Sequence, residues 1–118
     1  MKRDLGAARN GTEAWLWQRI SALVVVVFVP WAVWIVAEVR AGAWDQQKLL
    51  AVLDQPFARI LHTLFAVFVA LHTYLGLRAI AEDYLHRPVV RLGAEIALAL
   101  ATSAGLVWWL ALIWAWMG

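Results

Sequence analysis

The residues of this sequence best suited to metal or proton chemistry lie in and just after one long apolar run. The run extends from Ile60 to Ala81 and carries His72 near its middle. The acidic and phenolic pair Asp83-Tyr84 follows almost at once. Because an ionisable side chain deep in a membrane helix is costly, it normally faces a partner, a cofactor or a water-filled cavity.

His72 begins a stripe of small residues when the run is drawn as a helix. Gly76, Ala79 and Asp83 follow it at spacings of four, three and four, which keeps them on one face. An imidazole there can ligate haem iron, while the small residues let a porphyrin edge approach the backbone. The same stripe can also pack against another helix, with the histidine hydrogen-bonded across the seam.

His62 lies ten residues before His72 in the same run. In a helix that separation is about 15 Å along the axis and about 80° around it, so the two cannot share one iron. A structural or solvent-facing role near the outer interface is favoured for His62. The alternative is a ligand for a second haem.

Two acidic residues, Glu82 and Asp83, lie at the carboxyl end of this helix, where the macrodipole disfavours negative charge. A local violation of this kind can mark a functional site. The alternative is neutralisation by ion pairs at helical spacing, Arg78 with Glu82 and Asp83 with Arg87.

Tyr84 places a phenolic donor at the same level as Asp83. Tyr is a common anchor at membrane interfaces and needs no chemistry there. A quinone, however, needs a hydrogen-bond donor at its carbonyl oxygen and a nearby acid to relay protons. Tyr84 and Asp83 together can supply both.

The composition places these residues in a bilayer. Of 118 residues, 64% are hydrophobic and only 15% are charged, which is too apolar for a soluble domain of this size. The net charge of +2 makes nucleic acid an unsuitable partner. Since cysteine is absent, this polypeptide cannot by itself carry an iron–sulfur cluster, so other subunits must supply any electrons it handles.

Three apolar segments predict an all-α integral membrane protein, a single domain over residues 1–118. We predict transmembrane helices over about 20–38, 58–85 and 90–117. A polar surface arm precedes them over residues 1–19, with Asn10-Gly11 as a turn signal.

Prolines punctuate the predicted helices. Pro30 should kink the first helix, and Pro56 stands where the second can begin after a polar loop from 38 to 58. Pro88 should end the second helix in a short turn. Trp108, Trp109, Trp114 and Trp116 crowd the last turns, as expected at a membrane–water interface.

Positive charge is concentrated at one end of this arrangement. The arm and the turn between the second and third helices carry seven basic residues, namely Lys2, Arg3, Arg9, Arg19, Arg78, Arg87 and Arg91. The other side carries three, Arg40, Lys48 and Arg59. The positive-inside rule therefore predicts a cytoplasmic amino terminus.

The combined pattern resembles a known family. Arg9-Asn10-Gly11, then Arg19, then His72-Thr73-Tyr74-Leu75-Gly76 and Glu82-Asp83-Tyr84 are similar to the hydrophobic membrane anchor subunit of succinate dehydrogenase. The resemblance spans almost the whole chain. Its most specific part is the joint spacing of His72, Gly76, Asp83 and Tyr84.

The resemblance implies a role for four residues. His72 is then the axial ligand of haem b, which is shared with a second three-helix cytochrome b anchor. Arg19 contacts a haem propionate, Tyr84 hydrogen-bonds ubiquinone, and Asp83 serves as a proton relay at the quinone site. The chain becomes half of a heterodimeric haem-binding anchor.

The resemblance also implies partners and a location. A flavoprotein subunit and an iron–sulfur subunit oxidise succinate to fumarate, a step of the tricarboxylic acid cycle, and electron transport ends on ubiquinone in the bacterial cytoplasmic (inner) membrane. The anchor is not catalytic alone, and lipid surrounds it.

Two features depart from the family pattern and concern its peripheral contacts. Glu13 stands where some relatives carry histidine, and the Trp content is high.

Two alternative functions stay open. One is an anchor of quinol:fumarate reductase, which runs the reaction the other way, and the other is a structural membrane subunit without haem, in which the His72 stripe is only a packing seam.

Overall fold

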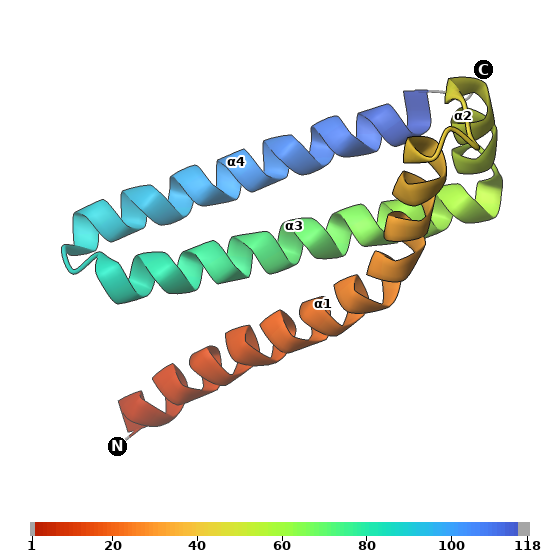
Figure 1. Ribbon diagram of the computed structural model, residues 1–118. Helices are drawn as coiled ribbons and strands as arrows, with labels where there is room; N and C mark the ends of the chain where they lie inside the picture. Colours follow the sequence, from red (N-terminus) through yellow and green to blue (C-terminus); the bar gives the residue numbers. More distant parts are fainter. Residues whose placement is uncertain (1, 116–118) are drawn as a thin grey trace.

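The computed structural model describes the backbone of residues 2–115 and the side chains of residues 11–115. Within that range the regular structure is entirely helical, as predicted. Figure 1 shows its four helices, α1 (Lys2–Arg40), α2 (Gln46–Leu53), α3 (Pro56–Tyr84) and α4 (Pro88–Ala115). Three stretches, Gly11–Arg40, Pro56–Tyr84 and Pro88–Ala115, are long and apolar enough to cross a membrane. The chain is therefore a multi-pass membrane protein.

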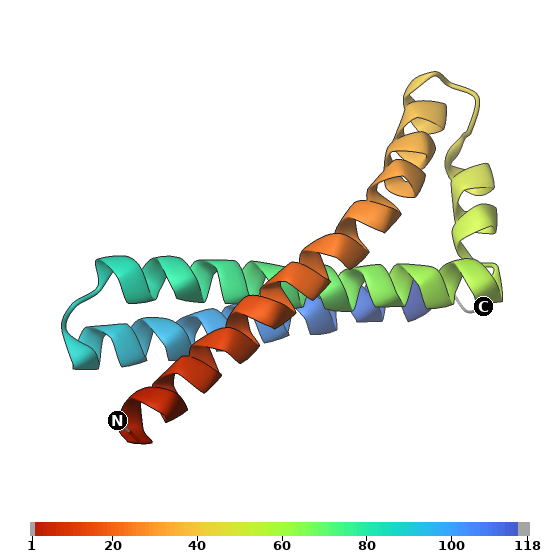
Figure 2. The ribbon, with the colours of Figure 1, turned by 90° about the horizontal axis from the view of Figure 1, so that it is seen from below.

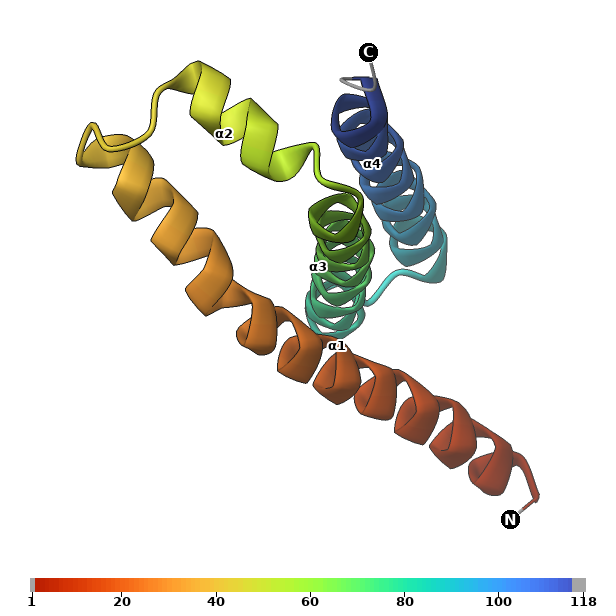
Figure 3. The same cartoon turned by 90° about the vertical axis from the view of Figure 1, so that its right-hand side faces the viewer.

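Helix α3 is the central element of the bundle. It packs along α4 in an antiparallel hairpin and is crossed at an angle by α1 (Figures 2 and 3). The start of α1 and the α3–α4 turn lie at one end of the molecule, whereas α2 lies at the other (Figure 1). Most of the basic residues grouped in the orientation argument thus belong to one end, whereas Arg19 lies about midway along α1.

The turn signal predicted in the amino-terminal arm does not end the helix, and the first helix begins earlier than the predicted residue 20. Helix α1 begins at Lys2 and continues through the Asn10-Gly11 turn signal into the apolar span. Extending an existing helix avoids the cost of nucleation, so two weak helix formers do not end it. Pro30 lies inside α1, and Figure 1 shows the predicted change of direction in the orange part that contains it.

The connections are more ordered than predicted. The segment expected to be a polar loop contains α2, whose N-cap Asp45 accepts a hydrogen bond of 2.8 Å from the backbone N–H of Lys48. Pro56 opens α3 as predicted, whereas Pro88 is the first residue of α4 rather than part of the turn before it. The predicted end of the last helix at 117 lies outside the described residues.

The molecule has almost no interior of its own. Ser21 and Ala66 are fully buried, but large apolar side chains such as Val27 (74% exposed) and Leu100 (67% exposed) face outward. Apolar surface on this scale requires lipid or other protein to cover it. The outer surface of the folded chain is thus suited to contact with lipid or with partner proteins.

An aromatic cluster joins the three long helices at the α2 end. The His62 ring lies edge-on to Trp31 and Trp109, at centroid distances of 6.3 and 5.8 Å. The indole Nε1 of Trp109 donates a hydrogen bond of 2.9 Å to His62 Nε2. The ring nitrogen that would bind a second iron is therefore already an acceptor, which supports the structural role.

Two of the tryptophans predicted as interface anchors make hydrogen bonds to side chains of α3. Trp109 bonds His62, and Trp114 donates a hydrogen bond of 3.2 Å to the Thr63 hydroxyl. Trp108 is 70% exposed, which fits an anchor role, and Trp116 lies outside the described residues.

Replacing His62 tests this assignment. We expect His62→Phe to lower the stability of the assembled protein by about 1 kcal/mol, because the Trp109 N–H loses its acceptor. Thermal denaturation in detergent measures the loss. In the matched double variant His62→Phe/Trp109→Phe the two losses should be less than additive, and strict additivity would reject the hydrogen bond as their cause.

Candidate functional site

The stripe that begins at His72 faces α1 in its first turns. His72 Nδ1 lies 3.2 Å from the hydroxyl of Ser21, which is fully buried. One turn later, a Cβ added to Gly76 would lie 3.9 Å from the side-chain amide nitrogen of Gln18, Nε2, which is an ordinary van der Waals contact. The packing seam considered from the sequence therefore exists, and α1 forms its other side.

The second ring nitrogen of His72 has no such engagement. The side chain is half-buried, and among the described residues Nε2 has no hydrogen-bond partner. An imidazole fixed through one nitrogen and open at the other is the usual arrangement of a histidine that binds a metal. The donor set thus fits one axial position of a haem iron. Nowhere in the described part of the chain do three His, Asp or Glu side chains gather to hold a metal ion.

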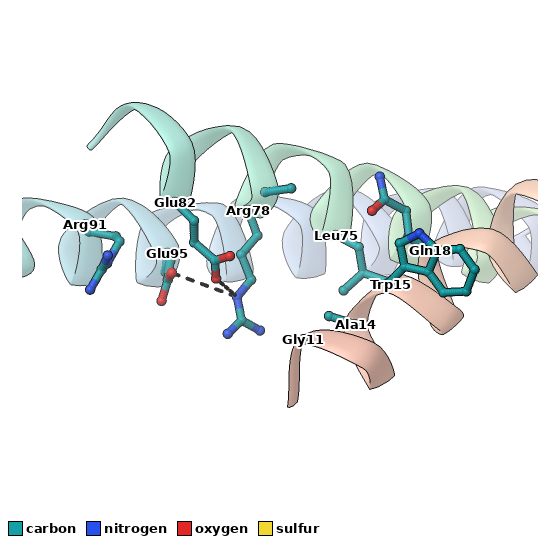
Figure 4. Close-up of a pocket in the computed structure, with 10 residues that line it drawn as sticks. Gly11, Ala14, Trp15, Gln18, Leu75, Arg78, Glu82, Arg91 and Glu95 are labelled. Carbon is teal, nitrogen blue, oxygen red and sulfur yellow. Dashed lines mark hydrogen bonds and ion pairs between the residues drawn. The ribbon is translucent and has the colours of Figure 1, made fainter. Parts of the chain in front are cut away.

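An open pocket of about 740 Å³ lies beside this seam, toward the α3–α4 turn (Figure 4). Its lining comes from α1, α3 and α4: Gly11, Ala14, Trp15, Gln18, Leu75, Arg78, Ala79, Glu82, Arg91 and Glu95. His72 is not part of this lining. Gln18 links the two places, because its backbone carbonyl accepts a hydrogen bond from Ser21.

Charged residues at one edge of the pocket neutralise one another. Figure 4 shows Arg78 between two carboxylates, with its Nε 3.0 Å from Glu82 and 3.8 Å from Glu95. The predicted pair of Arg78 with Glu82 is thus confirmed. The partner on α4 was not predicted from the sequence, although an isolated Glu95 in an apolar run was a sign that it needed one.

The second predicted ion pair does not form. Helix α3 ends at Tyr84, so Asp83 and Arg87 are not on consecutive turns of one helix. Within the described residues Asp83 has no ion pair or hydrogen bond, and its side chain is exposed. Tyr84 beside it is 77% exposed. Both side chains are therefore accessible to a molecule at this end of the bundle.

Arg19 lies on a different face of α1 from the one that contacts His72. At about 100° per residue it is about 160° around α1 from Ser21, the residue that touches His72. Its guanidinium lies 5.3 Å from the centre of the Trp15 ring, a cation–π contact. Among described side chains it makes no ion pair. The structure thus does not bring Arg19 together with His72 directly.

Comparison with known proteins agrees with this architecture. A family model described as the succinate dehydrogenase/fumarate reductase transmembrane subunit matches residues 1–108. The succinate dehydrogenase hydrophobic membrane anchor subunit of Paracoccus denitrificans is 32% identical over 80 residues, which cover 68% of this chain and 60% of that protein.

A second relative gives the same result. The protein of the same description from Rickettsia bellii is 29% identical over 84 residues, which cover 70% of this chain and 65% of that protein. The matched region thus spans less than two thirds of the length of both relatives. The family match covers nearly all of the chain, including the three candidate membrane spans up to residue 108. The chain therefore belongs to the succinate dehydrogenase/fumarate reductase transmembrane subunit family.

Proposed function

We propose that this chain is a membrane anchor subunit of succinate dehydrogenase that supplies one axial ligand to haem b and part of a ubiquinone-reduction site. The observation that carries the proposal is the geometry of His72, which Ser21 fixes at Nδ1 while Nε2 is without a protein partner in the described residues. A second anchor subunit would supply the other ligand, because this chain offers only one histidine at that level.

When bound, haem b supplies an iron that accepts and releases one electron. The role of this chain is to hold and enclose it. His72 provides the ligand, and its contact with Ser21 of α1 sets the orientation of its ring. Arg19 is the candidate for pairing with a propionate, since its exposed guanidinium has no ion-pair partner among described side chains. This role requires the propionate to reach the outer face of α1.

Tyr84 and Asp83 serve ubiquinone at the end of α3. The Tyr84 hydroxyl donates a hydrogen bond to a quinone carbonyl oxygen, where negative charge develops on reduction. Asp83 relays the protons that the reduced oxygen takes up. Their exposure and lack of internal partners support this assignment, because neither side chain must leave another contact to act.

The remaining parts of the reaction belong to other subunits. Without cysteine this chain holds no iron–sulfur cluster, so electrons from succinate reach it through an iron–sulfur subunit and a flavoprotein subunit. The complex lies in the bacterial cytoplasmic membrane with the amino terminus of this chain in the cytoplasm, which also places the α3–α4 turn, Asp83 and Tyr84 on that side. Quinol:fumarate reduction is the same chemistry reversed.

A second candidate is a structural subunit without haem. The Ser21–His72 contact favours it, because a packing seam alone explains a histidine in the span. The two candidates differ in what they need from His72. Packing uses Nδ1 alone, whereas haem ligation also uses Nε2.

The histidine variant decides between them. We expect His72→Ala to abolish or strongly reduce the haem of the complex co-expressed with its partner subunits, without preventing membrane insertion. The reduced-minus-oxidised optical band, normalised to protein, measures haem content. His62→Phe is the matched control and should retain haem. A complex with wild-type haem content in His72→Ala would assign the histidine to packing.

The tyrosine variant tests the quinone site separately. We expect Tyr84→Phe to lower succinate:ubiquinone reductase activity by at least about 10-fold, because the quinone oxygen loses its donor in the transition state. Succinate oxidation with a soluble dye should persist, since the dye takes electrons from the soluble subunits. Tyr74→Phe, half-buried on α3, is the control. Equal loss of both activities would reject the quinone role.

A further inference from the structure

The hydroxyl of Ser21 stands between two hydrogen-bonding groups. It lies 2.9 Å from the backbone carbonyl oxygen of Gln18, one turn earlier in α1, and 3.2 Å from His72 Nδ1 on α3. A carbonyl oxygen can only accept, so the single hydroxyl proton is donated to Gln18. With the hydroxyl proton assigned to Gln18, the hydroxyl oxygen is the acceptor from His72, and this assignment puts the proton of the neutral imidazole on Nδ1.

This arrangement sets the chemical state of His72. With its proton on Nδ1, the neutral ring carries its lone pair on Nε2, the nitrogen without a protein partner in the described chain. Ser21 is fully buried, so water does not compete for the contact. Moving the proton to Nε2 would require the Ser21 hydroxyl to turn away from Gln18 and donate to Nδ1, which gives up the Ser21–Gln18 hydrogen bond.

We propose that Ser21 is the positioning residue of the haem ligand, fixing both the tautomer and the ring orientation of His72. The inference rests on the proposed haem role of this chain. Outer partners of this kind usually contribute 10- to 100-fold to metal affinity. Loss of the Ser21 hydroxyl should therefore raise haem release about 10-fold and change the electronic character of the ligand.

The test compares three variants of the complete complex. Ser21→Ala removes only the oxygen, Ser21→Thr keeps a hydroxyl, and Ser103→Ala removes an exposed span hydroxyl on α4 as the matched control. The measurements are the rate of haem transfer to excess apomyoglobin and the low-spin electron paramagnetic resonance g-values of the oxidised haem. A purely structural serine would not move the g-values. Ser21→Ala should show faster transfer and shifted g-values, whereas Ser21→Thr and Ser103→Ala should resemble the wild type.

The outcomes separate this inference from the function on which it rests. If His72→Ala loses haem while Ser21→Ala keeps the wild-type transfer rate and g-values, the positioning role is overturned and the haem role stands. If Ser103→Ala changes the transfer rate and g-values as much as Ser21→Ala does, the effect is not specific to the contact with His72, and the positioning role is again overturned. If His72→Ala retains full haem, the ligand assignment fails and the positioning role fails with it.

Discussion

Polar groups inside a bilayer must find partners within the protein, and this constraint organises the whole bundle. Helices α1 and α3 meet where the Ser21 hydroxyl satisfies His72. Helices α3 and α4 are joined near one end by Trp109 and His62 and near the other by Arg78 and Glu95. Since few side chains are buried, these polar contacts set the register of helices whose apolar surfaces would otherwise pack in many ways.

The sequence predicted the three spans well because hydropathy responds to length and apolarity, which the bilayer dictates directly. Two features escaped it for identifiable reasons. The amino-terminal part of α1 is helical because it extends a helix that already exists, which local turn signals do not reveal. Helix α2 is short, and its signals, the cap Asp45 and a run of good helix formers, are brief enough to be taken for part of a loop.

The site was predicted as a face but not as a contact. Helical spacing placed His72 and Gly76 on one stripe, yet periodicity cannot say which neighbour a stripe meets, and the neighbour proved to be α1 of the same chain. The partnership of Arg78 with Glu95 was out of reach for the same reason, since it depends on how two helices align. The predicted pair of Asp83 with Arg87 does not form, because α3 ends between the two residues, at Tyr84.

The bond from Ser21 to the Gln18 carbonyl is internal to α1, and this bears on biogenesis. A newly made first span can enter the membrane with its one buried hydroxyl already satisfied, before α3 has been synthesised. A lone pair of the hydroxyl oxygen then stays available to accept from the imidazole of His72 when α3 packs against α1. The serine can thus serve insertion through its proton and helix docking through its oxygen.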